Sequence, residues 1–372
     1  MKINLAIFSG ARSEYGVLKP LLYELDNNKN IDFKIIVHGM HLLKTFGNTI
    51  FEIRKDWPRN KIEEINTCSE KIKNKIEEFT ITLNKLNQYL KNEKFDAGFI
   101  VGDRLEAYAS AMAAHFNNIP IIHSGGGAIT NGALDDYYRF NITNISKIHL
   151  ATSKSCYNRL LQCPLVNKCN VYFVGSIPVE GIKAFKKTST SIHHNIPKLK
   201  KRKFGLLTFH PVTKLDEPTA ELMEFSISKI LDNKHDILIT YPNNDLGYEA
   251  ILNVIKKWES HPNVYIVKNL GVKWYYSALR DCAFTLGNSS SGIIEAPYFS
   301  KPVINIGSRQ EGREKDVGII DVEPKTSSLE KALNQGFRKG WPAVKSNNLY
   351  GDGETVKKVI DIITNNFIYA ET

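Results

Sequence analysis

Several short segments of the sequence carry side chains suited to binding phosphate or to transferring protons. The first runs from Ser9 to Gly16, where small residues would let a phosphate approach the backbone and Arg12 could donate paired hydrogen bonds to it. An ordinary turn with an exposed arginine, leading into a helix that begins near Gly16, has the same composition. Residues 9–16 alone therefore leave both interpretations open.

Two further segments combine carboxylates with glycines and a cation. Asp103 follows an expected strand, where it is either an acid–base group or the cap of the next helix. Gly125 to Gly127 would allow a ligand to approach the backbone closely. Asp135, Asp136 and Arg139 then open another expected helix, in which the acids either transfer protons or complement the helix dipole.

The segment Gly287 to Glu295 follows a strand and leads into a helix. Hydroxyls and backbone amides at such a helix start can bind an anion, and Glu295, about one turn on, could accept hydrogen bonds from a pair of ribose hydroxyls. The alternative is a serine-rich surface turn, but the context favours diphosphate binding. The residues proposed to contact the diphosphate are Ser289, Ser290, Ser291 and Gly292.

Two more segments follow strands and carry cationic or titratable side chains. His210 could neutralise a phosphate or move a proton. Arg309 and Arg313 lie in the loop after the expected strand 302–306, where they face a base, a phosphate or solvent.

These segments require parallel sheets to position them. Short β-branched runs alternate with helix-like stretches, a pattern that predicts βα units. Parallel sheets bind ligands at the carboxyl ends of their strands, where the segments above fall. The expected strands are 3–8, 33–37, 97–101, 119–122 and 171–174, then 204–209, 236–240, 264–267, 282–286 and 302–306.

The chain length of 372 residues and a change of composition indicate two domains. Apolar periodicity disappears between Lys186 and Arg202, where Lys, Ser, Thr, His and Pro crowd together. We predict an N-terminal domain at 1–185 and a C-terminal domain at 203–352. A final segment, 353–372, contains an amphipathic helix at 355–365 that in two-lobed folds often returns to the first domain.

Composition excludes several classes of protein. Hydrophobic residues make up 42% and charged residues 24%, which is typical of a globular protein. No apolar run reaches the roughly 18 to 20 residues of a membrane span. The five cysteines lack C-x-x-C spacing, so neither disulfides nor zinc are expected, and a cytoplasmic location fits best. Much of the net charge of +10 lies between Lys183 and Lys203, which indicates a solvated linker rather than a nucleic-acid site.

Taken together, the segments resemble the hydrolysing UDP-N-acetylglucosamine 2-epimerase family of sialic- and legionaminic-acid-type pathways. The resemblance covers almost the whole chain, and the serine turn with its following strand and loop is its most specific part. The matching segments are Gly10, Arg12 and Tyr15, then 39–42, 46–49, 102–104, 132–136, 210–213, 241–245, 287–295, 303–307 and 309–313.

The resemblance implies a pair of Rossmann-like α/β domains of the glycosyltransferase-B type, with the ligand in a cleft between them. A UDP- or GDP-linked N-acetylamino sugar would lose its C2 proton, eliminate the nucleotide, and add water with inversion at C2. The resemblance implies a homodimer or homotetramer. It implies no cofactor or metal, and no nucleic-acid or membrane partner. Nucleotide positions match Arg12, Ser289, Ser290, Ser291, Gly292, Glu295, Arg309 and Arg313.

The resemblance also assigns residues to the chemistry. Asp103 and Asp135 are the candidate acid–base pair, while Arg139 and His210 would balance charge on the departing diphosphate. Further sugar-side candidates are His41, His123 and Asp136.

Two departures from the family pattern thin the acid–base groups on the sugar side. Gly125 stands where members have Glu or His, and Ala128 stands where they have Glu. The loss of one general acid or base typically costs about 10² to 10⁴-fold in rate. The departures leave open an altered substrate, a glycosyltransferase, a non-epimerising hydrolase, or a nucleotide-sugar-binding protein with weak activity.

Overall fold

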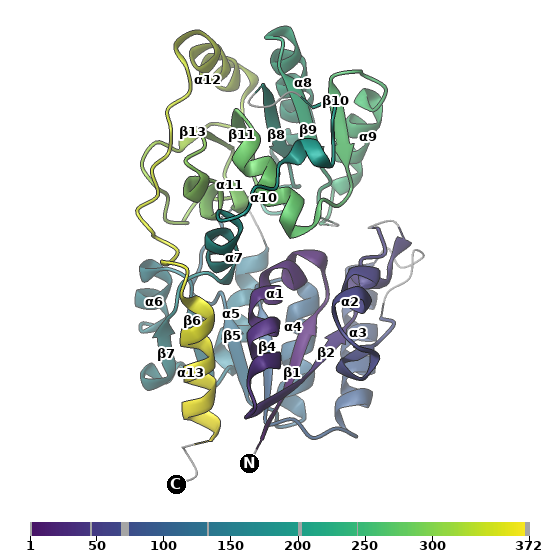
Figure 1. The fold of residues 1–372 in the computed structure, drawn as a ribbon. Helices are drawn as coiled ribbons and strands as arrows, with labels where there is room; N and C mark the ends of the chain where they lie inside the picture. Colours follow the sequence, from purple (N-terminus) through teal and green to yellow (C-terminus); the bar gives the residue numbers. More distant parts are fainter. Residues whose placement is uncertain are drawn as a thin grey trace. The chain divides into compact units, whose positions relative to one another are not determined.

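The structure, a computed structural model, describes residues 2–44, 47–67, 74–131, 134–199, 203–243 and 245–368. Some residues of the sequence motifs lie outside these ranges, namely Phe46, Cys68, Gly132, Ala133, Asn244 and the basic residues 200–202. The chain divides into two compact units, which Figure 1 colours along the sequence. Unit 1 comprises Met1–Ala128, Asp135–Gly181 and Tyr350–Thr372, and unit 2 comprises Ile129–Leu134 and Ile182–Leu349.

Unit 1 contains a parallel sheet of seven strands in the order β3-β2-β1-β4-β5-β6-β7. The central strands are runs of buried β-branched and aromatic residues, as expected where helices cover both faces of a sheet. Because β1 pairs with β2 on one side and β4 on the other, strand order reverses there, and ligands bind at such points. The strands are β1 Ile3–Ser9, β2 Ile31–Val37, β3 Ile62–Glu64, β4 Ala97–Val101, β5 Ile121–Ser124, β6 Ile148–Ala151 and β7 Val171–Phe173.

The helices of unit 1 pack their apolar faces on this sheet. Their buried residues join the strands in two apolar clusters. The helices are α1 Arg12–Asn27, α2 Ile50–Asp56, α3 Lys75–Leu90, α4 Leu105–Phe116, α5 Asp135–Ile145, α6 Lys154–Leu160 and α13 Thr355–Phe367, with α7 Ile177–Phe185 running on into unit 2.

Unit 2 repeats the same topology with six parallel strands in the order β10-β9-β8-β11-β12-β13. Strand order reverses between β8 and β11. The strands are β8 Phe204–Thr208, β9 Asp236–Thr240, β10 Val264–Val267, β11 Phe284–Gly287, β12 Val303–Ile306 and β13 Ile320–Val322. The helices are α8 Thr219–Asp232, α9 Tyr248–Trp258, α10 Gly271–Asp281, α11 Ser290–Ile294 and α12 Thr326–Lys339.

The prediction of two Rossmann-like α/β domains is confirmed, while three strands were not predicted. The edge strands β3 and β13 are three residues long and carry acidic residues, and β6 contains a histidine, so none has a clear apolar run. The predicted start of the first helix near Gly16 is wrong. The helix begins at Arg12 because Ala11 adopts an extended N-cap conformation and the Glu14 side chain folds back on it.

The described residues contain no membrane-spanning helix, disulfide or metal-binding cluster. No helix within those ranges is both long and apolar enough to cross a bilayer. The four cysteines that the structure places are free. No group of three His, Cys, Asp or Glu side chains in the described ranges is arranged to hold a metal ion.

The last helix, α13, packs beside α1 and completes the core of unit 1 (Figure 1). Its approach requires two glycines, since a Cβ at Gly175 would lie 3.0 Å from the Gly351 Cα atom and Gly175 has φ +89°. The Ser176 N–H then donates to the Tyr350 carbonyl at 2.7 Å. The C-terminal segment is therefore part of the core of unit 1.

We predict that Ile363→Ala destabilises unit 1 by about 2 to 4 kcal/mol, because Ile363 is fully buried and its truncation leaves a cavity. Chemical denaturation measures the effect. The exposed Asp361→Ala, on the same helix, serves as the control. Equal stabilities of the two variants would show that α13 does not contribute to the core.

Candidate functional site

A buried cation organises the polar residues of unit 1. Arg139 on α5 is 0% exposed, and its Nε donates to Asp103 Oδ2 at 3.0 Å, with Nη2 binding the same oxygen. Its Nη1 donates to the Ala128 carbonyl at 2.8 Å and also binds Asp136. Burial would lower the pKa of Arg139, but the Asp103 and Asp136 carboxylates outweigh it and raise the pKa. The guanidinium therefore remains charged and holds both acids in place.

The structure excludes one of the two alternatives for Asp103. Asp103 is not a helix cap, because the N-cap of α4 is Arg104, whose side chain makes no capping hydrogen bond. Asp135 and Asp136 lie in the first turn of α5, so both can complement its dipole. Asp136 additionally binds Arg139. Asp135 is half-buried and directly precedes Asp136 in the sequence.

His123 supports the same loop from within the sheet. It lies in β5, is 0% exposed, and its Nε2 donates to the Gly102 carbonyl at 2.8 Å. Burial lowers the pKa of His123 to about 4, so the ring is neutral at physiological pH. A neutral, buried ring bonded to the residue before Asp103 acts as a support for that residue.

The other histidine candidate, His41, is also fully buried. Its ring bridges the hydroxyls of Ser9 and Thr49 at 3.0 and 2.7 Å. Burial lowers its pKa to about 3. Arg12, by contrast, is partly exposed at the first position of α1.

The two departures in the glycine-rich loop are built into the local backbone. Gly125 has φ +101°, a left-handed conformation that a Glu or His would adopt only with strain. Ala128 is 5% exposed and packs among apolar residues that include Cys156 and Leu160. A carboxylate at 128 would be buried against these apolar side chains, which cannot solvate its charge.

A second buried cluster, at the start of α1, was missed by sequence reasoning. Glu14 Oε2 accepts hydrogen bonds from the Gly10 and Ala11 N–H groups at 2.6 and 3.3 Å, while Oε1 has no hydrogen-bond partner. Burial, and then the nearby Glu106 carboxylate, raise the pKa of Glu14 to about 8. Glu106 in turn lies 3.4 Å from Arg104. The signal in the sequence was the acid three residues after the N-cap position.

We predict that Glu14→Gln removes a pH dependence from the stability of the protein. Because the pKa is raised from 4.5 to about 8, the stabilising neutral form is fully present below pH 4.5 and is lost as pH rises through 8. Gln mimics the neutral acid, so the variant should match the wild type near pH 5 and exceed its stability by roughly 3 kcal/mol near pH 8.

Denaturant unfolding between pH 5 and pH 8 measures this difference. Glu24→Gln, an exposed position on the same helix, is the control and should leave the pH profile unchanged. Parallel profiles for wild type and Glu14→Gln would contradict a neutral Glu14.

In unit 2, one residue connects three loops at the carboxyl ends of the strands, through its side-chain amide and its backbone carbonyl. Asn288 follows β11, is 2% exposed, and its Oδ1 accepts from the His210 N–H at 2.7 Å while its Nδ2 donates to the His210 carbonyl at 2.8 Å. The Asn288 carbonyl accepts from Gln310 at 2.9 Å and Arg309 at 3.3 Å. Arg309 also lies 3.8 Å from Asp245.

The serine turn presents a chain of hydroxyls that ends on a carboxylate. Ser289 caps α11 by accepting from the Ser291 N–H. The Tyr275 hydroxyl donates to Ser291 Oγ at 2.7 Å, and Ser291 Oγ donates to Glu295 Oε2 at 2.5 Å. Burial raises the pKa of Glu295 to about 7. Glu295 thus changes charge near neutral pH, in the position expected for a ribose-binding group.

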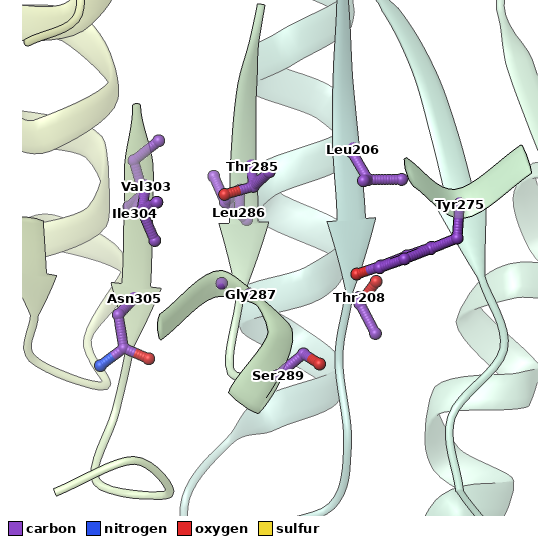
Figure 2. A pocket seen from close by; sticks show the side chains of 11 residues that line it. Leu206, Thr208, Tyr275, Thr285, Leu286, Gly287, Ser289, Val303, Ile304 and Asn305 are labelled. Carbon is purple, nitrogen blue, oxygen red and sulfur yellow. The ribbon is translucent and has the colours of Figure 1, made fainter. Parts of the chain in front are cut away.

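A pocket opens beside this turn, at the ends of β8, β11 and β12 (Figure 2). In the figure the Tyr275 and Thr208 hydroxyls point toward one another among the lining side chains. The turn approaches β8 so closely that only glycine fits, since a Cβ at Gly287 would lie 2.0 Å from the Thr208 carbonyl oxygen. The lining residues are Leu206, Thr208, Tyr275, Thr285, Leu286, Gly287, Ser289, Gly292, Val303, Ile304 and Asn305.

Comparison with known proteins identifies the family. The model of the UDP-N-acetylglucosamine 2-epimerase family matches residues 23–364. The chain belongs to this family. It is 30% identical to the UDP-N,N'-diacetylbacillosamine 2-epimerase (hydrolyzing) of Legionella pneumophila, over 95% of this chain and 94% of that protein. It is also 30% identical to the GDP/UDP-N,N'-diacetylbacillosamine 2-epimerase (hydrolyzing) of Campylobacter jejuni, over 91% and 87%.

Solved structures of the family share the fold. The UDP-GlcNAc 2-epimerase of Neisseria meningitidis, solved bound to UDP-GlcNAc, has a TM-score of 0.78 at 17% identity, with 98% of this chain and 100% of that chain covered. The family match and the two relatives above confirm the resemblance to the hydrolysing 2-epimerase family.

Within the family framework, the structure groups the predicted residues by unit. Asp103, Asp136 and Arg139 contact one another in unit 1. In unit 2 the serine turn holds Glu295. Sequence reasoning gave no role to Asn288 and Gln310, although both lie in segments it singled out, and it missed Tyr275 on α10. A neutral amide or phenol carries no signal without its partner.

Proposed function

We propose that the protein is a hydrolysing nucleotide-sugar 2-epimerase that acts on a UDP- or GDP-linked N-acetylamino sugar and supplies a precursor for surface glycans. The observation that carries the proposal is the Asp103–Arg139 ion pair, which presents a carboxylate of 22% side-chain exposure on a buried cation. The names of the relatives include both nucleotides and a diacetylated sugar. Family membership supplies the reaction class.

Unit 2 offers the groups suited to the nucleotide. We assign the diphosphate to the segment Ser289 to Gly292 and the ribose to Glu295, whose carboxylate already accepts a hydrogen bond from Ser291. Arg309 and Arg313 supply positive charge in the loop after β12, and Arg12 supplies it from unit 1. Hydroxyls, amides and guanidiniums are the donors that diphosphates require.

Unit 1 offers the acid–base groups. A carboxylate of the pair Asp103 and Asp135 takes the proton from sugar C2, the C1–O bond breaks with its electron pair going to the diphosphate, and a glycal forms. Water then adds its hydroxyl to C1, and C2 receives a proton on the opposite face. We assign Arg139 to holding Asp103, because it donates to Asp103, the Ala128 carbonyl and Asp136, all within unit 1. Stabilisation of the diphosphate then falls to His210 and the arginines of unit 2.

We predict that incubation in deuterated water with UDP-N-acetylglucosamine, and with UDP- and GDP-linked diacetylated 6-deoxy sugars, yields free nucleotide diphosphate and a sugar that is inverted and deuterated at C2. Elimination followed by hydration requires the new C2 proton to come from solvent. Nuclear magnetic resonance of the product reads configuration and deuterium together. Asp103→Asn should lower turnover by about 10² to 10⁴-fold.

The same experiment separates the other activities of this scaffold. A free sugar with retained C2 configuration and no deuterium would contradict the proposal and indicate a non-epimerising hydrolase. Transfer of the sugar to an acceptor would indicate a glycosyltransferase. Binding without any product would indicate a nucleotide-sugar-binding protein, which the Gly125 and Ala128 departures would then explain.

We predict that nucleotide affinity depends on pH through Glu295. With a pKa near 7, the carboxylate that accepts ribose hydroxyls is lost as pH falls, so UDP binding should weaken by up to about tenfold from pH 8 to pH 6. Calorimetry measures the affinity. Because UDP itself titrates, the quantity to follow with pH is the difference in UDP binding free energy between the wild type and Glu295→Gln. An identical pH dependence in the two proteins would exclude this role.

A further inference from the structure

The imidazole of His210 is held by a backbone donor. The Asn243 N–H, in the loop after β9, donates to His210 Nδ1 at 3.1 Å. His210 is 8% exposed, so water does not readily replace this bond. A nitrogen that accepts a hydrogen bond carries no proton, so the geometry selects the ring form with the proton on Nε2.

Protonation of the ring would break this arrangement. A proton on Nδ1 would face the Asn243 N–H, and two donors would then oppose each other in a buried site. Nδ1 is therefore an acceptor from within unit 2, and the ring's donor is Nε2–H. A histidine in this state donates a hydrogen bond but has no additional proton to transfer.

Asn288 fixes the backbone that carries this ring. Its amide pairs with both the N–H and the carbonyl of His210, as a neighbouring strand would. Because Arg309 and Gln310 bind the Asn288 carbonyl, the loop after β12 is tied to the same point. The position of the ring thus depends on one neutral side chain.

We propose that His210 stabilises the departing diphosphate as a neutral hydrogen-bond donor through Nε2–H rather than as an imidazolium acid. Asn288 and the Asn243 backbone are positioning groups that set this ring state. The inference rests on the proposed function for the identity of the acceptor, but the ring state itself does not depend on it. Removal of one preorganised donor of this kind typically costs about 10² to 10³-fold in rate.

The charged groups of the loops around His210 bear on its protonation. Arg309 and Asp245 lie 3.8 Å apart, and Glu217, in the same loop as His210, binds the N–H and hydroxyl of Ser308. The two carboxylates and the guanidinium are themselves engaged, and none of these bonds replaces the Asn243 N–H at Nδ1. The backbone donor therefore decides the ring state.

The first test reads the ring directly in the ligand-free protein. Two-bond proton–nitrogen correlation on a sample labelled at histidine nitrogens, with His210 assigned by its disappearance in His210→Gln, should show an unprotonated Nδ1 and a protonated Nε2 from pH 6 to 8. His261, whose Nδ1 accepts from the Asn263 N–H at 3.3 Å, provides a reference for the same bond type. A doubly protonated ring, or a proton on Nδ1, at pH 7 would overturn the proposal.

The same spectrum tests the positioning role of Asn288. Asn288→Asp keeps the side-chain size but removes the donor to the His210 carbonyl. The variant should shift the His210 nitrogen signals toward a mixture of the two neutral ring forms. If Asn288 only stabilised the loops, the His210 signals would not change. Unchanged signals would therefore contradict the positioning role of Asn288.

The second test uses turnover. Gln places an N–H close to where Nε2–H lies but cannot act as an acid, so His210→Gln should retain activity within about tenfold of the wild type, while His210→Ala should lose about 10² to 10³-fold. His261→Gln is the matched control and should turn over as the wild type does. Equal losses in His210→Gln and His210→Ala, with UDP binding retained in both, would overturn the donor role.

The two proposals fail in different ways. If the wild type turns over no nucleotide sugar, the proposed function fails while the ring state can still be read. If the wild type epimerises and the ring is an imidazolium, only the donor inference fails.

Discussion

The structure of unit 1 depends on the requirement that a buried guanidinium be fully paired. Arg139 has no exposure to water, and an unpaired cation in that position would cost several kcal/mol. Two carboxylates and a backbone carbonyl meet the requirement, and they come from three separate segments: the end of β4, the glycine-rich loop and the first turn of α5. One side chain therefore fixes the relative positions of Asp103 and Asp136 more rigidly than their loops would.

Unit 2 meets a similar need with neutral groups. Its strands end in loops whose backbone N–H and carbonyl groups are buried, and these groups need partners as much as side chains do. Asn288 satisfies groups of the His210 loop with its amide and groups of the β12 loop with its carbonyl. The result is a set of loops held by hydrogen bonds at the edge of the sheet where the strand order reverses.

The departures from the family pattern have a physical explanation in the loop after β5. The left-handed conformation at Gly125 would strain a Glu or His side chain there, and the apolar environment of Ala128 would make a buried carboxylate costly. Of the two carboxylates that we propose as the acid–base pair of unit 1, Asp103 is the one that Arg139 holds. An altered sugar pocket on a conserved pair of domains is consistent with relatives that act on a diacetylated sugar.

The class of fold could be predicted from the sequence, because β-branched runs that alternate with helix-like stretches indicate the buried strands and helices of βα units. The sequence also predicted the positions of most strands, and it placed the serine turn and Asp103 directly after strands. Edge strands such as β3, which carry little apolar signal, could not be found this way. Three contacts could be seen only in the folded protein: Asp103 binds Arg139 instead of capping a helix, Glu14 is buried, and Asn288 holds His210. Each depends on partners distant in the chain or on burial, and a linear pattern contains neither.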